Sequence, residues 1–327
     1  VGKIFDALKR MGVNYAFDTV FSADLTIMEE STEFIKRFTS GELKERPMFT
    51  SCCPGWVRFA KTQFPYMVNY LSTAKSPQQM FGALIKTWFA KREGIDPGDI
   101  CSVSVMPCTA KKFECTRPEM KDSGYQDVDI SITVQELAAL IRAGGIDFSE
   151  LPDTPFDDPF GEGSGAGLIF GATGGVMEAA LRTVYAVVTG KEMEHLDYTP
   201  VRGFEGIKES QVDLNGRVIK VAVAHGIKNA KILLEKVKNG TADYQFIEIM
   251  ACPGGCIGGG GNPPKTWSIM EKRKKAIYEA EAELPVRQSH KNPAIQKIYE
   301  TYLGEPCGEL SHKLLHTEYC NRQDLLQ

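Results

Sequence analysis

The sequence has no excess of basic residues, no long apolar run and too few cysteines for a disulfide scaffold. Among 327 residues, 38 Lys and Arg stand against 42 Asp and Glu, giving a formal net charge of −4. Because no basic tract stands out, the chain lacks the electrostatic signature of nucleic-acid binding, and no nucleic-acid partner is expected. No apolar run approaches the roughly 18–20 residues of a membrane helix, so no membrane span is expected either.

A signal-like segment is also missing at the start of the chain, which begins at Val1 rather than Met. We therefore expect a cytoplasmic location, with periplasmic export left open because the N-terminus looks incomplete. The apolar share of 43% and the charged share of 24% are ordinary for a globular protein, which excludes bulk disorder.

Apolar runs alternate with amphipathic stretches, which predicts an α/β fold. We expect two lobes of mainly parallel sheet flanked by helices, roughly 1–155 and 160–264, followed by a helical segment 265–327. The predicted strands are Pro47–Thr50, Ile100–Met106, Asp129–Val134, Val218–Ala224 and Tyr244–Met250. The predicted helices are Val1–Arg10, a helix from the capping-box pattern Thr26-x-x-Glu29 to Gly41, Gln78–Lys91, Val134–Ala143, Val176–Val188, Asn229–Lys238 and Trp267–Ala282.

The 9 cysteines are too sparse for a disulfide scaffold and are clustered in unusual motifs. Three predicted strands each end in a cysteine loop: TSCCPGW at 50–56, MPCTAKKFE at 106–114 and EIMACPGGCIGGGG at 248–261. Because ligand sites of α/β sheets form beyond the carboxyl ends of strands, these loops are expected to converge on one buried site. Burial as a small apolar side chain is the expected role of Cys101, Cys307 and Cys320.

The loops offer four thiols to a metal: Cys53, Cys108, Cys252 and Cys256. Structural zinc sites usually show paired Cys knuckles, whereas an iron–sulfur cluster needs four thiolates. The flanking glycines let backbone N–H groups come close to anionic sulfur. An iron–sulfur site is therefore favoured, with structural zinc as an alternative.

The three loops resemble the signature motifs of [FeFe]-hydrogenases. Further similar segments follow in family order along nearly the whole chain: SPQQMFG (Ser76–Gly82), SGAGLIFGATGGVMEAALR (Ser164–Arg182), VRGFEGIKE (Val201–Glu209) and SHKLLHTEY (Ser311–Tyr319). The resemblance implies a catalytic H-cluster domain over 1–264, with the metal cluster in the cleft between its lobes. It also implies that segment 265–327 is similar to a fused small subunit.

The resemblance implies a [4Fe–4S] cubane on Cys53, Cys108, Cys252 and Cys256. Cys256 would also bridge to a two-iron subsite with CO, cyanide and azadithiolate ligands, where H2 is made or split. Lys111 would donate to a cyanide ligand, since an ammonium aimed at an anion is a strong contact. The side chains expected to line the subsite are Ser76, Gln78, Met106, Met250 and Phe170.

A buried site also needs protons, and a thiol can donate and recover one near neutral pH. By resemblance, the relay would run from Cys52 through Glu30, Ser72 and Glu33 to Arg37 at the mouth, with water bridging one gap.

The residues after Gly165 do not form a dinucleotide fingerprint, because Phe170 stands where G-x-G-x-x-G needs its last glycine.

Two family features are absent from the sequence: an Ala-Pro-x-Val-Arg loop before the first helix, and N-terminal ferredoxin-like clusters. We therefore expect electrons to come from an upstream ferredoxin-like domain or a soluble ferredoxin. Protons and H2 would be the substrates, and maturation proteins would supply the two-iron subsite. The alternatives are a hydrogen-sensing member of the family and a non-catalytic iron–sulfur protein of cluster assembly or electron transfer.

Overall fold

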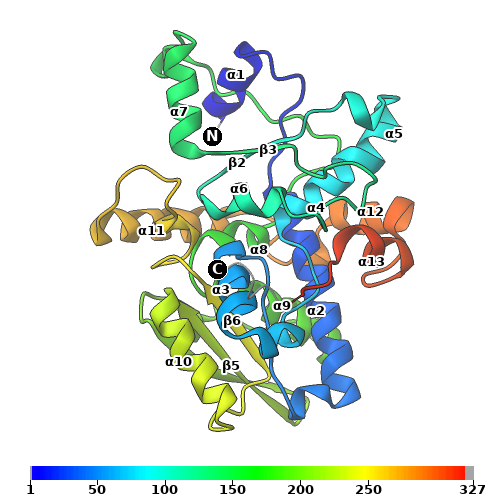
Figure 1. Cartoon of the computed structure of the whole chain (residues 1–327), viewed down its shortest axis with the longest axis vertical. Coiled ribbons are helices and arrows are strands. Elements are labelled where there is room, and N and C mark those ends of the chain that lie inside the picture. The colour runs from blue at the N-terminus through cyan, green and yellow to red at the C-terminus, as the bar shows by residue number, and fades with distance from the viewer. Residues whose placement is uncertain (1, 321–327) are drawn as a thin grey trace.

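The structure, a computed structural model, describes residues 2–320 and contains two separate sheets (Figure 1). The four-stranded sheet has the order β1-β6-β5-β4, and the other sheet pairs β2 with β3. The strands are β1 (Met48–Phe49), β2 (Val103–Met106), β3 (Ile130–Thr133), β4 (Ile207–Leu214), β5 (Arg217–His225) and β6 (Phe246–Met250). All neighbours run parallel except β4 and β5. The predicted α/β fold with mainly parallel sheets is confirmed.

Helices cover the sheets and connect their strands. They are α1 (Gly2–Arg10), α2 (Val20–Ser40), α3 (Pro54–Gln63), α4 (Pro77–Leu84), α5 (Ala90–Glu93), α6 (Ala110–Cys115), α7 (Val134–Ala143), α8 (Gly165–Leu168), α9 (Gly175–Thr189), α10 (Ile227–Lys238), α11 (Trp267–Glu283), α12 (Pro293–Ile298) and α13 (Glu309–Leu315). A π-helical turn, Ile85–Phe89, joins α4 to α5. Helix α7 has the predicted bounds, because a capping box between Thr133 and Glu136 fixes its start.

The predicted start of α2 is wrong. The helix begins at Val20, and Thr26 lies inside it, where its hydroxyl donates to the Ser22 carbonyl at 3.1 Å. The first turn is instead bonded by Asp18, whose carboxylate accepts from the Val20 amide at 3.0 Å. The turns before Thr26 are helical because they carry buried side chains, including Phe21. Packing therefore overrides the capping-box pattern here.

Strand β4 was not among the predicted strands. Its exposed and buried residues alternate, and polar residues interrupt the apolar pattern. The signal that marks it is the Asn215-Gly216 turn, in which both residues have positive φ (57° and 81°) and Leu214 pairs with Arg217. An Asn-Gly pair in this conformation is the preferred two-residue connection of a β-hairpin.

The central strands β5 and β6 of the four-stranded sheet are covered on both faces over most of their length. Helices α2 and α9 cover one face, toward which Val221, Val223 and Phe246 point. Helices α3 and α10 cover the other face, which receives Ala222 and Ile247. Successive side chains of a strand point to opposite faces, so β5 and β6 read as continuous apolar runs.

The two sheets do not divide the chain at residues 155–160. Strand β1, from the earlier part, pairs with β6 from the later part, through Met48–Phe246 and Phe49–Ile247. The sheet of β2 and β3 lies at the other end of the molecule (Figure 1). Residues 321–327 of the predicted segment 265–327 lie outside the described residues. Among residues 2–320, no helix has both the length and the hydropathy of a membrane span.

Candidate functional site

Three loops that follow strands bring Cys53, Cys108, Cys252 and Cys256 into one region. Cys53 lies between β1 and α3, and the loop of Cys252 and Cys256 follows β6. Because β1 and β6 are parallel neighbours, these two loops leave the sheet at the same edge. Cys108 comes from the other sheet, between β2 and α6. The loops thus meet from two sheets rather than one.

The four thiols are close enough to affect one another's ionisation, and all are free and half-buried. Burial raises the pKa of Cys53 to about 11, and the charges of Cys108 and Cys252 add to the shift. Burial also raises the pKa of Cys256, with the other three thiols adding to it. Thiolates this close in a site of low dielectric repel one another and need a cation among them. Four thiols in mutual reach fit a [4Fe–4S] cluster.

Glycines allow these loops to touch. A Cβ on Gly259 would lie 2.0 Å from the carbonyl oxygen of Pro107, and the amide of Gly261 donates to the same oxygen at 3.0 Å. At the start of α3, a Cβ on Gly55 would lie 3.1 Å from the Cβ of Ala251. Larger residues would push the loops apart, so the glycines set the spacing between the thiols.

Lys111 is buried and held at the edge of the thiol cluster. Its ammonium donates to the Glu114 carboxylate at 2.8 Å and to the Cys52 carbonyl at 3.2 Å. Burial lowers the pKa of Lys111, but the charges of Glu114, Cys108 and Cys52 together outweigh that effect and the net shift is upward, so Lys111 is a cation. The same carboxylate oxygen accepts from Ser76 at 2.8 Å and from Gln78 at 3.1 Å. Glu114 thus gathers three of the predicted site residues.

The predicted apolar residues Met106 and Met250 stand where the cysteine loops begin, and Phe170 packs against the core. Met106 and Met250 are buried at the ends of β2 and β6. The sulfur of Met250 lies 2.9 Å from where a Cβ on Gly255 would stand, directly before Cys256. Phe170 is half-buried and packs against the core under α9.

Cys52 lies between the thiol cluster and the interior of α2. Its ionisation responds to Glu30, Cys53, Lys111 and Cys256, so all four groups are near its sulfur. Burial, followed by the charges of Glu30 and Cys53, raises the pKa of Cys52 well above its usual range. The thiol therefore carries its proton at neutral pH.

Glu30 is fully buried, and neither of its carboxyl oxygens has a hydrogen-bond partner among the described residues. Burial, and after it the charge of Glu33, raises the pKa of Glu30 to about 8. Ser72 and the backbone of Ser51 are near enough to oppose this shift. At neutral pH the carboxyl group holds a proton, and it stands between Cys52 and Ser72.

From Ser72 outward the hydrogen bonds are continuous. The Ser72 hydroxyl donates to Glu33 at 2.8 Å, and the Arg37 guanidinium donates to the other Glu33 oxygen at 2.5 Å. The amide of Thr73 also donates to Glu33, at 2.9 Å. Arg37 is half-buried and additionally donates to the Leu71 carbonyl at 3.1 Å. The five residues of the predicted relay therefore lie in sequence from the thiols toward the surface.

The remaining predicted cysteines differ from expectation. Cys101 and Cys320 are exposed rather than buried. Cys307 is half-buried, but its neighbours Glu29 and His316 are polar. Its apolar interpretation is therefore wrong as well, because sequence neighbours say little about which side chains a loop meets in the fold.

Two family models match the chain in succession. The iron only hydrogenase large subunit, C-terminal domain, matches residues 1–260, and the iron hydrogenase small subunit matches residues 268–322. The chain belongs to the iron-only hydrogenase family. The resemblance stated from the three cysteine loops is thereby confirmed.

Similar proteins and structures carry hydrogenase names. The NADP-reducing hydrogenase subunit HndD of Solidesulfovibrio fructosivorans is 50% identical over 99% of this chain, and iron hydrogenase 1 of Clostridium pasteurianum is 45% identical over 97%. Each match spans 56% of the relative, so this hydrogenase-family chain covers about half of their length. The apo form of a variant of [FeFe]-hydrogenase HydA1 from Chlamydomonas reinhardtii aligns with a TM-score of 0.85 and 42% identity, covering 98% of this chain and 87% of that one.

A more distant relative has a different name. The cytosolic iron-sulfur assembly component 3 of Mus musculus is 33% identical over 97% of this chain and 68% of its own length. The hydrogenases are thus the more similar relatives, and the assembly proteins share the same overall family.

Two residues of this hydrogenase-family site had no predicted role. Glu114 lies three residues after Lys111 on α6, at the spacing of a helical ion pair, and this spacing was the available signal. Thr73, which holds Glu33 through its backbone amide, carries no such signal, because a main-chain donor is not specified by residue type.

Proposed function

We propose that this chain is the catalytic core of an [FeFe]-hydrogenase that interconverts protons, electrons and H2. Cys53, Cys108, Cys252 and Cys256 would hold a [4Fe–4S] cubane, and Cys256 would bridge it to a two-iron subsite with CO, cyanide and azadithiolate ligands. When bound, that group would supply the redox and H2-binding chemistry. The observation that carries this proposal is the position of Cys52, beside two cluster thiols, Lys111 and Glu30.

The chain's own part begins with orientation. Lys111 is a buried cation fixed by Glu114, and it would donate to a cyanide ligand of the subsite. Ser76 and Gln78 share the same carboxylate and would line the subsite beside it. Met106, Met250 and Phe170 would form the apolar wall that excludes water.

Proton delivery is the second part. Cys52 would give its thiol proton toward the subsite and recover one from the Glu30 carboxylic acid, with a water molecule bridging one of the gaps beside Glu30. The Ser72 hydroxyl then passes protons between Glu30 and Glu33 by accepting one while donating another. Arg37 donates to Glu33 and so orients that carboxylate at the mouth of the relay.

Partners and location follow from this function. A ferredoxin or an upstream ferredoxin-like domain would deliver electrons, and maturation proteins would install the two-iron subsite. We place the protein in the cytoplasm, although one relative, from Nitratidesulfovibrio vulgaris, is named a periplasmic hydrogenase large subunit and is 48% identical to this chain over 279 residues.

Substitutions of the adjacent residues Cys52 and Cys53 test the proposal. In protein produced with the maturation proteins, Cys53→Ala should lower iron per chain, since a cubane ligand is lost. Cys52→Ala should keep iron and the infrared bands of CO and cyanide, yet lose H2 turnover by a factor of about 10² or more. Cys52→Ser should rescue poorly because a hydroxyl is far less acidic, whereas Cys52→Asp should rescue in part.

The bridging role of Cys256 has a separate test. Cys256→Ala removes the only covalent tether of the two-iron subsite, so the CO and cyanide bands should disappear. Normal bands in this variant would contradict the assignment. Iron without CO bands in the wild-type protein would favour an assembly or electron-transfer role, and bands without appreciable turnover would favour a hydrogen sensor.

A further inference from the structure

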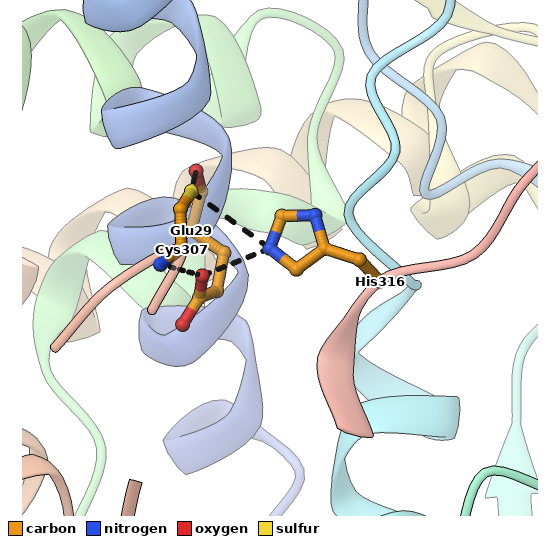
Figure 2. A group of neighbouring side chains, drawn as sticks. All are labelled: Glu29, Cys307 and His316. Atoms are coloured by element: carbon orange, nitrogen blue, oxygen red, sulfur yellow. Dashed lines mark hydrogen bonds and ion pairs between the residues drawn. The ribbon is translucent and has the colours of Figure 1, made fainter. Parts of the chain in front are cut away.

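A second cluster of metal-ligating side chains lies outside the proposed H-cluster site. Glu29 lies on α2, Cys307 lies on the loop before α13, and His316 directly follows α13. Figure 2 shows the three side chains pointing toward one another across the contact between α2 and the C-terminal segment. One donor atom from each lies within 4.8 Å of the others.

The distances suit a small ion. The His316 Nε2 atom lies 2.9 Å from the Glu29 Oε2 atom and 3.9 Å from the Cys307 sulfur. Zn–N and Zn–O bonds of about 2.0–2.2 Å and Zn–S bonds of about 2.3 Å put tetrahedral ligands roughly 3.3–3.8 Å apart. Binding therefore requires the Glu29 and His316 atoms to lie about half an ångström farther apart, and the Cys307 sulfur to lie slightly nearer to His316.

Both oxygen and nitrogen ligands are oriented by outer partners. The His316 Nδ1 atom lies 2.8 Å from the Thr73 hydroxyl, which leaves Nε2 facing the cluster. The Tyr299 hydroxyl donates to Glu29 Oε1 at 2.5 Å, and Glu29 Oε2 faces His316 while also accepting from the Cys307 amide at 2.6 Å. Ligand histidines and carboxylates in metal sites characteristically have their second polar atom fixed in this way.

The burial of Glu29 and His316 and the backbone conformation of Cys307 also favour a bound cation. Glu29 is fully buried and His316 is 4% exposed, so a charge here must be neutralised locally. A divalent cation would neutralise the carboxylate and a Cys307 thiolate together. Cys307 has φ of +52°, which is uncommon for a residue other than glycine, and its sulfur faces the other two ligands in this conformation.

We propose that Glu29, Cys307 and His316 bind a divalent ion of the zinc class, with water as the fourth ligand. The ion's role is structural. His316 and its neighbours pair with residues 73–75, through the Ala74–His316 bridge and the bond from the Thr317 amide to the Thr73 carbonyl at 2.8 Å. The ion would therefore fasten the C-terminal segment to α2 beside the Thr73 amide that holds Glu33.

Zinc itself is the probe. Protein with its iron cofactors assembled is freed of loose metal by dialysis, given zinc chloride, dialysed again, and analysed for iron and zinc per chain. We expect close to one zinc per chain in the wild type, and much less in Cys307→Ser and His316→Gln at unchanged iron content. Cys320→Ser and His195→Gln replace exposed residues of the same types outside the cluster, and both should retain the zinc.

X-ray absorption at the zinc edge of the wild-type protein tests the ligand set independently of any variant. A single sulfur with nitrogen and oxygen neighbours supports the proposal. A shell of four sulfurs would place zinc at the cubane cysteines, and a shell of oxygen and nitrogen alone would mean adventitious binding; either result overturns it. A melting temperature that rises with zinc in the wild type, but not in Cys307→Ser, is also expected.

Discussion

At the scale of single residues, Glu30 is the group whose surroundings are least ordinary. Buried carboxylates are normally hydrogen-bonded, yet both oxygens of Glu30 lack a partner among residues 2–320. Burial and the neighbouring Glu33 favour its neutral form, with a pKa of about 8. A carboxylic acid that keeps a proton at neutral pH is suited to pass it on. Burying this group without a hydrogen-bond partner among the described residues destabilises the folded protein.

The raised pKa of Glu30 predicts a pH-dependent stability. The folded group stays protonated up to about pH 8, whereas the unfolded group ionises above about 4.5, so unfolding releases a proton between these values. Stability should therefore fall by roughly 3–5 kcal/mol from this group as the pH rises from 4.5 to 8. Glu30→Gln cannot ionise and should lack this loss.

Unfolding curves of the wild type and Glu30→Gln at pH 5.5 and 8.5 would measure the difference. The variant should gain relative stability at the higher pH. Glu300→Gln removes an exposed carboxylate and serves as the control that should follow the wild type. Parallel pH profiles for Glu30→Gln and the wild type would show that Glu30 is ionised in the folded protein.

At the scale of elements, the contact between the β6 loop and the β2 loop determines where Cys108 sits. The two loops belong to different sheets and are joined where Gly259 and Gly261 meet the Pro107 carbonyl. No side chain fits at Gly259, because its Cβ would lie 2.0 Å from that oxygen. The spacing of the thiols therefore depends on a backbone contact rather than on side-chain packing.

Adjacent glycines allow a matched test of this contact. Gly259→Ala should separate the loops, destabilise the protein by roughly 1–3 kcal/mol and reduce iron per chain. Gly260→Ala should behave like the wild type, because the nearest atoms to its Cβ, on Thr109, lie 3.7 Å away. Melting temperature and iron content measure both effects. Equal iron loss in the two variants would mean that loop flexibility, not the Pro107 contact, is what matters.

At the scale of the whole molecule, the segment that matches the small-subunit family is built into the core. Buried Arg182 on α9 donates to Glu281 on α11 at 2.9 Å, to Glu178 at 2.8 Å and to the Arg287 carbonyl at 2.7 Å. Helices α12 and α13 pack with α2 and α4 in a second core cluster. The two matched regions thus fold as one unit in the described part of the chain.

Removing Glu281 from its buried ion pair with Arg182 should destabilise the contact between α9 and α11. Glu281→Ala leaves buried Arg182 with Glu178 as its remaining carboxylate and also removes a partner of Arg287, which should lower the free energy of unfolding by about 1–3 kcal/mol. Glu283→Ala removes an exposed carboxylate two residues later on the same helix, and should change stability by less than about 0.5 kcal/mol. Urea unfolding at low and high salt measures both. A small effect for Glu281→Ala, or one abolished by salt, would contradict a buried pair.

The sequence by itself determined the fold class and most elements, because β5, β6 and α7 carry strong local patterns of apolar residues and caps. It also determined which loops hold the thiols, since cysteine and glycine at strand ends are informative one residue at a time. It did not determine the start of α2, where the burial of side chains before Thr26 outweighs the capping-box pattern. It also did not reveal strand β4, which is marked by the Asn215-Gly216 turn and not by a run of apolar residues.

Only the tertiary structure decided what the loops and the terminal segments meet. The pairing of β1 with β6, the carboxylate of Glu114 shared by Lys111, Ser76 and Gln78, and the meeting of Glu29 with Cys307 and His316 join residues far apart in the chain. Such contacts follow from how helices and sheets pack around a common core. A local pattern records which face of an element is buried, but not which side chain from a distant segment will lie against it.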